Sequence, residues 1–135
     1  DFIVGYPGET KADFIETIEL VKQVNFAQAY SFKYSSRVGT KSSRLLSEEV
    51  CDEEKNDRLQ ALQEILNEQQ KNFNNSFISK NVEVLIKGKG KKDNQYRGTT
   101  KWVQVVNFEA VKKVNGFETV KIIKASNNSL LGEVL

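Results

Sequence analysis

The chain has 135 residues and a formal net charge of +2, and its 39% hydrophobic and 28% charged side chains fit a globular protein and exclude wholesale disorder. Its single cysteine, Cys51, and its lack of histidine exclude a disulfide, a cysteine cage for a metal and catalysis by histidine within this chain alone. No apolar run approaches the roughly 18 residues of a membrane-spanning helix, so we expect no membrane partner, and the absence of methionine predicts a piece of a longer polypeptide.

The first 34 residues predict a strand, a helix and a second strand. Residues 2–4 are a short apolar run that ends at a Gly- and Pro-containing turn. Thr10 and Asp13 have the spacing of a capping box, and the helix that they begin should end near Asn25. Alternating aromatic and polar residues predict the second strand over 29–34. This order is typical of a βαβ unit in a parallel sheet, where functional residues gather after the strands.

A long helix is expected from Ser47 to about Asn72. Ser47 is a suitable N-cap, and acidic residues follow it where the helix dipole favours negative charge. Leu59, Leu62 and Leu66 repeat at helical spacing, so one face of this helix should pack against its own domain. Cys51 falls in the predicted first turn and is interpreted as an ordinary thiol.

The second half of the chain predicts short strands separated by turns rich in Gly, Asn and Lys. The predicted strands cover residues 82–87, 95–99, 103–108, 118–124 and 130–134. Alternation is clear around Val120 and Ile122, which should point inward while Lys121 and Lys124 point outward. Five short strands in about 60 residues favour a small closed or nearly closed β-barrel.

The two halves differ in charge. Residues 1–75 hold 13 acidic and 9 basic side chains, whereas residues 76–135 hold 5 acidic and 11 basic ones. Such a difference predicts a domain boundary near residue 75. A basic module favours a polyanionic partner, with nucleic acid first, although a solvated lysine-rich surface explains the charge equally well.

The charge is densest over residues 80–101. The side chains predicted to contact RNA there are Lys87, Lys89, Lys91, Lys92, Arg97 and Lys101. Aromatic residues lie in the same stretch, a combination that suits a phosphate backbone with bases stacked on rings. The sequence leaves open whether Trp102 and Phe108 stack on bases or fill the barrel core.

Six short motifs together resemble one family. DFIVGYPGET over residues 1–10 and SFKYSSRVGT over 31–40 are similar to the late barrel motifs of the radical S-adenosylmethionine (SAM) methylthiotransferases. Four further motifs resemble the C-terminal TRAM domain of that family, which is a small RNA-binding barrel. They are KKD, RGT, VNF and NSLLGE over residues 91–93, 97–99, 106–108 and 128–133. The fold implied is α/β followed by all-β: the C-terminal part of a radical SAM partial (β/α) barrel over residues 1–75, then a five-stranded OB-like TRAM barrel over 76–135.

The resemblance points to the branch that converts N6-isopentenyladenosine beside the tRNA anticodon into its 2-methylthio derivative in the cytoplasm. The family uses two 4Fe–4S clusters and SAM. Its cluster ligands lie upstream of the matching segment and Cys51 matches none of them, so this chain alone is expected to lack catalysis. The implied partners are the tRNA anticodon stem-loop and the missing N-terminal part of the enzyme.

The resemblance also implies a few site residues in the first half. Gly5, Gly8 and Glu9 follow the first strand, where a radical SAM barrel lies near bound SAM. Arg37 follows the second strand, where it could meet RNA. No catalytic residue and no metal ligand is predicted.

Two other functions stay open at this point. One is a stand-alone TRAM-type RNA-binding module without catalysis. The other is a fragment of a methylthiotransferase that acts on threonylcarbamoyladenosine in tRNA or on a ribosomal protein, and the VNF motif at 106–108 is the feature that argues against it.

Overall fold

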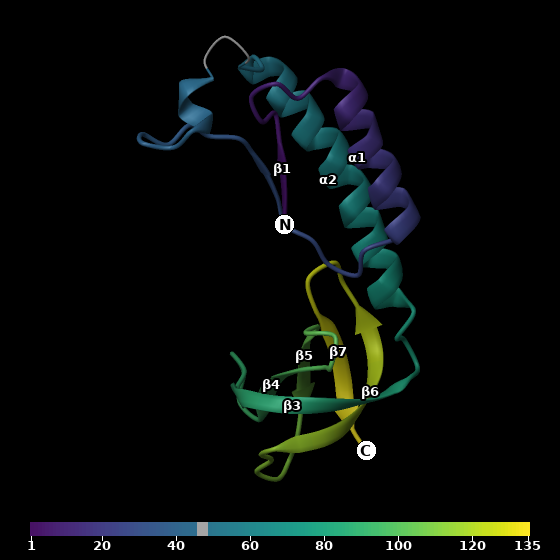
Figure 1. Cartoon of the computed structure of the whole chain (residues 1–135). Coiled ribbons are helices and arrows are strands. Elements are labelled where there is room, and N and C mark those ends of the chain that lie inside the picture. Colours follow the sequence, from purple (N-terminus) through teal and green to yellow (C-terminus); the bar gives the residue numbers. More distant parts are fainter. Residues whose placement is uncertain (46–48) are drawn as a thin grey trace. The chain divides into compact units, whose positions relative to one another are not determined.

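A computed structural model describes residues 1–45 and 49–135, and the chain divides into two compact units, Asp1–Gln69 and Gln70–Leu135 (Figure 1). Helix α2 (Asp52–Asn75) begins in the first unit and ends in the second. The assignment of 1–75 and 76–135 as functional domains stays a prediction, with its boundary at the C-terminal end of α2.

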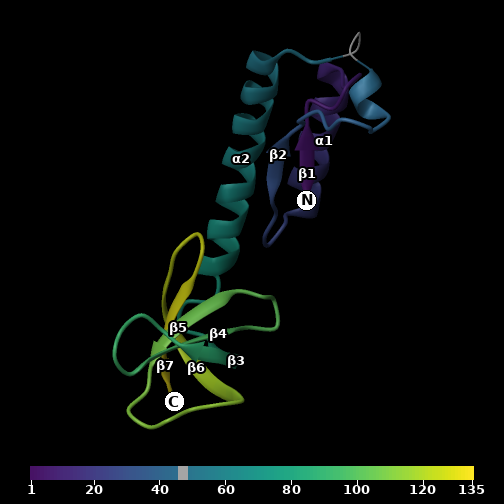
Figure 2. The ribbon, with the colours of Figure 1, turned by 90° about the vertical axis from the view of Figure 1, so that its left-hand side faces the viewer.

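The first unit contains a two-stranded parallel sheet. Strands β1 (Phe2–Val4) and β2 (Ser31–Lys33) lie side by side, with Phe2 opposite Ser31 and Val4 opposite Lys33 (Figure 2). Helix α1 (Lys11–Val24) connects them, so the predicted strand, helix and strand are confirmed. The second strand is shorter than the predicted 29–34.

The core of the first unit lies between its sheet and its helices. Val4 from β1, Val21 from α1, and Leu62 and Leu66 from α2 form one buried cluster. The predicted packing face of the long helix is therefore confirmed. A short 3-10 helix, η1 (Ser42–Arg44), follows β2 in the chain.

The predicted capping box at the start of α1 is present and makes a pH-dependent prediction. The Asp13 carboxylate accepts hydrogen bonds from the Thr10 amide at 2.8 Å and from the Thr10 hydroxyl at 2.7 Å. These bonds, the backbone one first, lower the pKa of Asp13 below its ordinary value. A lowered pKa means that the cap stabilises α1 above about pH 4 and is lost as the pH falls through the folded pKa. An NMR titration of the Thr10 amide should therefore have its midpoint below about 3.9; a midpoint at or above that value would contradict the cap.

Helix α2 begins later than predicted. Its first residue is Asp52, and Glu49–Cys51 are not helical, whereas the predicted cap Ser47 lies outside the described residues. The Cys51 carbonyl accepts from the Lys55 amide at 3.0 Å, so Cys51 precedes the helix. Three acidic residues then occupy the first turn, where the positive end of the helix dipole stabilises them. Within the described part of the chain, no helix is both long and apolar enough to cross a membrane.

The second unit is a closed five-stranded barrel, as predicted. Its strands are β3 (Asn81–Lys89), β4 (Gln95–Thr99), β5 (Val105–Glu109), β6 (Phe117–Ala125) and β7 (Leu130–Val134). They close in the order β3-β4-β5-β7-β6, with β5 and β7 parallel and the other pairs antiparallel (Figure 1). Closure gives every strand a hydrogen-bonded neighbour at both of its edges; β3, for example, pairs with β6 over 81–85 and with β4 over 85–89.

The interior of the barrel shows the predicted alternation. Val120 and Ile122 are fully buried and Lys121 is exposed. A register shift between Ile122 and Lys124 then turns Lys124 outward as well. The third predicted strand starts later than expected because Val103 has a φ of 65°, which a strand residue does not adopt.

Candidate nucleic-acid interface

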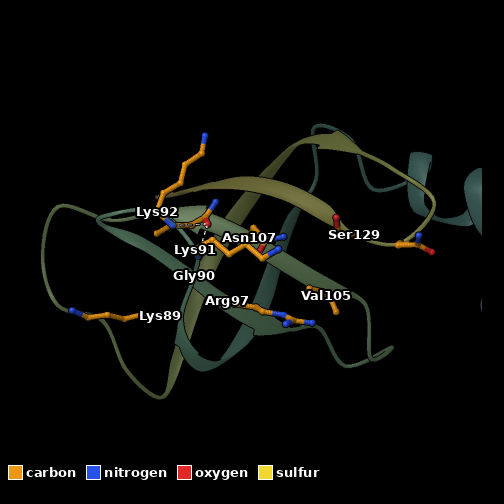
Figure 3. A pocket seen from close by; sticks show the side chains of 10 residues that line it. Lys89, Gly90, Lys91, Lys92, Arg97, Val105, Asn107 and Ser129 are labelled. Atoms are coloured by element: carbon orange, nitrogen blue, oxygen red, sulfur yellow. Dashed lines mark hydrogen bonds between the residues drawn. The ribbon is translucent and has the colours of Figure 1, made fainter.

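A positively charged groove of about 560 Å³ crosses one side of the barrel (Figure 3). We call it the basic groove, and its lining residues are Lys89, Gly90, Lys91, Lys92, Gln95, Arg97, Val105, Asn107, Asn128 and Ser129. Four of the six basic side chains predicted between residues 87 and 101 are thus brought together here. None of these lining residues, all of them in the described part of the chain, is acidic, so the field of the groove attracts anions.

One wall of the basic groove is the turn between β3 and β4. The side-chain Oε1 of Gln95 accepts hydrogen bonds from the Lys91 amide at 3.0 Å and the Lys92 amide at 3.4 Å. A backbone bond of 2.7 Å joins the Gly90 amide to the Gln95 carbonyl. A Cβ atom on Gly90 would lie 2.5 Å from Gln95 Oε1, so a larger residue there would have to displace the Gln95 side chain. The turn is fixed while the lysine side chains stay exposed.

The other wall carries amide and hydroxyl groups that sequence reasoning did not assign to RNA. Asn107 lies on β5 directly opposite Arg97 on β4. Asn128 and Ser129 come from the turn between β6 and β7, in which the Ser126 amide donates to the Ser129 carbonyl at 2.8 Å. Amides donate and accept hydrogen bonds, so this wall can recognise base edges or sugar hydroxyls beside the phosphate-binding lysines.

A buried polar network supports that turn from the end of α2. The Asn74 side-chain amide donates to the carbonyls of Ser126 and Asn127, both at 2.9 Å. The Gln104 amide donates to Asn74 Oδ1 at 2.8 Å, and the Thr100 hydroxyl donates to Gln104 Oε1 at 3.0 Å. Asn74, Thr100 and Gln104 are all buried, which makes this chain of hydrogen bonds a fixed part of the second unit.

The cations of the basic groove are available to a ligand. Among the described residues, the ion pairs involve only Lys22, Lys55 and Arg58 as cations. Lys91, Lys92 and Arg97 therefore carry charges that no carboxylate within salt-bridge distance neutralises in this part of the chain, and their side chains are exposed. Figure 3 shows the Lys89 side chain pointing away from Arg97 and Asn107.

The aromatic residues near the groove divide between core and surface. Phe108 is fully buried in the barrel core, which decides the question that the sequence left open. The Tyr96 ring stacks on it, with a centroid distance of 6.0 Å and an interplanar angle of 20°. Trp102 is 42% exposed and packs edge-on against Phe77, and the Lys101 ammonium lies 4.4 Å from its ring centroid.

The remaining predicted RNA contacts lie outside the basic groove. Lys87 lines a neighbouring pocket on the barrel together with Lys89. Lys101 lies in the loop before β5, beside Trp102. Arg37 belongs to the first unit, where it is exposed and its carbonyl accepts from the Thr40 hydroxyl at 2.7 Å.

The turn predicted to lie near SAM is held by an ion pair. Glu9 Oε1 accepts from the Gly5 amide at 2.9 Å and from Arg58 Nη1 at 2.6 Å. Arg58 also donates to the Glu9 carbonyl at 3.0 Å and pairs with Glu54. Gly5 and Gly8 have φ angles of 70° and 89°, which glycine adopts without strain. The Glu9 carboxylate thus holds the turn together.

Arg58 is a buried cation that sequence reasoning did not single out. Its side chain is only 6% exposed. Burial by itself lowers the pKa of Arg58, but hydrogen bonds and charges from Glu9 and Glu54 outweigh burial and raise the pKa above its ordinary value. The guanidinium therefore stays charged at any physiological pH.

The described residues do not suit a metal or a cluster. No group of three or more Cys, Asp or Glu side chains in 1–45 and 49–135 is placed to hold a metal ion. Cys51 is an exposed free cysteine. An iron–sulfur cluster needs several cysteine thiolates, and the chain has one cysteine, so these residues do not fit the clusters implied by the motif resemblance.

Curated relatives match the chain over nearly its full length. A tRNA-2-methylthio-N(6)-dimethylallyladenosine synthase of Erythrobacter litoralis is 43% identical over 138 aligned positions that cover 100% of this chain. The synthases of that name from Wolbachia pipientis and Ehrlichia chaffeensis are 46% and 45% identical and cover 98% and 100% of it. The chain spans about 30% of the length of these relatives. No family model matches the sequence.

Proposed function

Since this chain belongs to the tRNA-2-methylthio-N(6)-dimethylallyladenosine synthase family over the segment that it matches, we propose that it supplies tRNA binding to such a methylthiotransferase. The observation that supports this most is the basic groove, whose lining residues include three lysines, one arginine and amide side chains but no carboxylate. Cations would hold the phosphates, and the amides of Asn107 and Asn128 would contact bases or sugars.

The two units would correspond to two parts of the enzyme. We assign the barrel to a TRAM domain, because its five closed strands carry the charge and the motifs of that module. We assign the first unit to the C-terminal part of a radical SAM barrel, because β1, α1 and β2 form a parallel βαβ unit. We propose that the enzyme works in the cytoplasm on N6-isopentenyladenosine beside the anticodon. The relatives' name supports the modified base of this proposal, because the dimethylallyl group that it contains is the isopentenyl group.

The chemistry would need residues from outside this sequence. A single cysteine cannot ligate a 4Fe–4S cluster, so cluster ligands would come from the remaining part of the enzyme, and this chain alone would not catalyse methylthiolation. Gly5, Gly8 and Glu9 would form one edge of the SAM site through the turn that they build. Because Glu9 Oε1 already accepts two hydrogen bonds, its role there would be to hold this turn.

RNA binding by the full 135-residue chain tests the proposal. We expect it to bind an anticodon stem-loop RNA with an affinity that falls as salt rises, because each cation–phosphate contact releases counterions. The Lys91→Gln and Lys92→Gln variants should each lower the slope of log affinity against log salt by about 1. The measurement is fluorescence anisotropy of the labelled stem-loop over a series of salt concentrations.

Lys121→Gln is the matched control. Lys121 is an exposed lysine of the same barrel, but it lies on β6 and does not line the basic groove. Its substitution should change the slope by less than either groove variant. Binding that is absent at low salt, or equal slopes for all three variants and the unchanged chain, would count against the proposal.

A further inference from the structure

A second pocket of about 550 Å³ lies on the barrel next to the basic groove. We call it the tyrosine pocket, and its lining residues are Ile86, Lys87, Gly88, Lys89, Tyr96, Lys113, Val114 and Asn115. Lys89 lines both the basic groove and the tyrosine pocket, so the two hollows are neighbours. Lys113, Val114 and Asn115 come from the loop between β5 and β6, which the sequence did not connect with RNA.

The fold holds both sides of this pocket in place. On one side, β3 has a register shift between Ile86 and Gly88, so Lys87 is an extra residue without a partner on β4. On the other side, the loop is fixed at both ends, since the Ala110 amide donates to the Asn94 carbonyl at 3.0 Å and the Ile86 amide donates to the Gly116 carbonyl at 2.8 Å. Val114 is 4% exposed and anchors the middle of the loop in the core.

The floor of the pocket is apolar and aromatic. Tyr96 is partly exposed and packs against the core, where its ring is supported by the stacked ring of Phe108. Because the Tyr96 ring is held by this packing, it loses little conformational entropy when a planar ligand stacks on it. Ile86 is partly exposed and extends the apolar surface beside Tyr96, on which a planar group can lie.

Cations surround this aromatic floor. Lys87, Lys89 and Lys113 are exposed, and no acidic side chain is among the lining residues. Asn115 adds an exposed amide that can donate to and accept from the edge of a base. A stacking surface with cations at its margin suits an unpaired nucleotide, whose base and phosphate need these two kinds of contact.

We propose that the tyrosine pocket binds one unpaired nucleotide of the RNA, with its base on Tyr96 and its phosphate between Lys87 and Lys113. The strand continues past Lys89 into the basic groove, so the barrel contacts single-stranded RNA along both hollows. This inference rests on the proposed function, because it assumes that RNA is the polyanion bound by the barrel.

The test compares two RNA probes on the full chain. One is an anticodon stem-loop with an unpaired loop, and the other is a blunt RNA duplex with the same number of phosphates. Tyr96→Ala should weaken binding of the stem-loop by about 5- to 150-fold, the usual worth of one base–aromatic stack, without changing the salt slope. Binding of the duplex should change by less than twofold, and Tyr96→Phe should keep most of the stem-loop affinity because it keeps the ring.

A second variant keeps the inference testable if Tyr96→Ala loosens the barrel. Lys113 is exposed, so Lys113→Gln should leave folding intact and lower the salt slope for the stem-loop by about 1. If Tyr96→Ala folds and binds the stem-loop as the unchanged chain does, or if Lys113→Gln leaves the slope unchanged, the tyrosine pocket is not an RNA site. If Lys91→Gln still weakens binding in that case, the proposed function stands and only this inference fails.

Discussion

The Arg58→Ala variant is expected to destabilise the first unit by about 3–5 kcal/mol, the usual cost of removing one partner from a buried ion pair. The side chains of Arg58 and Glu9 are 6% and 13% exposed. Without the guanidinium, Glu9 keeps its bond from the Gly5 amide but loses its countercharge, and the Glu9 carbonyl loses a donor as well. A buried carboxylate without a countercharge destabilises the folded state. The loss of folding free energy should therefore exceed the loss from removing an ordinary surface salt bridge.

Hydrogen exchange measured by mass spectrometry resolves this effect within the first unit. Peptides from β1 and from the first turns of α2 should lose protection in Arg58→Ala, while barrel peptides keep theirs. Lys22→Ala is the control, since Lys22 pairs with Glu19 on the exposed face of α1. This substitution should change the free energy of unfolding by less than about 0.5 kcal/mol. The double variant Glu9→Gln with Arg58→Met should recover part of the loss, because it leaves no isolated charge. Equal protection in Arg58→Ala and Lys22→Ala would mean that the ion pair does not hold the turn.

This ion pair also shows what the sequence could not reveal in the first unit. The resemblance to the radical SAM methylthiotransferases implied that Glu9 lies near SAM, and the motif that carries this resemblance is local, over residues 1–10. Its partner Arg58 is 49 positions away in a helix with many charged residues. Because arginine is usually exposed, nothing in the local pattern distinguishes a buried guanidinium from a solvated one.

The barrel was more predictable than the long helix. The predicted strands 95–99 and 130–134 coincide with β4 and β7, because alternation and turn residues are local signals. The start of α2 was wrong by several residues. Acidic residues stabilise the first turn of a helix wherever that turn begins, so the run of acidic residues is compatible with more than one first residue of α2. Which residue begins the helix then depends on tertiary contacts.

The candidate interface was predictable in its charges but not in its other residues. Lysines 89, 91 and 92 and Arg97 were found from charge density, since such side chains are rarely buried. Asn128 and Lys113 were not proposed as contacts, because barrel closure brings distant turns to the groove and the pocket. The positions of these two residues depend on the order of the strands in the barrel, and this order cannot be predicted from composition.

The Asn74→Ala variant is expected to destabilise the barrel by about 2–3 kcal/mol, the usual cost of leaving a buried polar group without its hydrogen-bond partner. The variant removes donors from the Ser126 and Asn127 carbonyls and the acceptor of the Gln104 amide. Ser126 and Asn127 are exposed, so water replaces the lost donors at little cost. The Gln104 side chain is 8% exposed and cannot exchange its partner for water, so this orphaned amide and the lost packing account for most of the effect.

Urea unfolding followed by the fluorescence of Trp102, the only tryptophan, measures this loss in the second unit alone. Asn72→Ala is the matched control, because Asn72 is an exposed asparagine of the same helix and should change the free energy of unfolding by less than about 0.5 kcal/mol. Adding Gln104→Leu to Asn74→Ala removes the orphaned amide, so the double variant should be less destabilised than the two single losses added together. Strict additivity would contradict the buried network. A coupled network would instead mean that the end of α2 fixes the turn carrying Asn128 and Ser129, so that one wall of the basic groove is preorganised before RNA arrives.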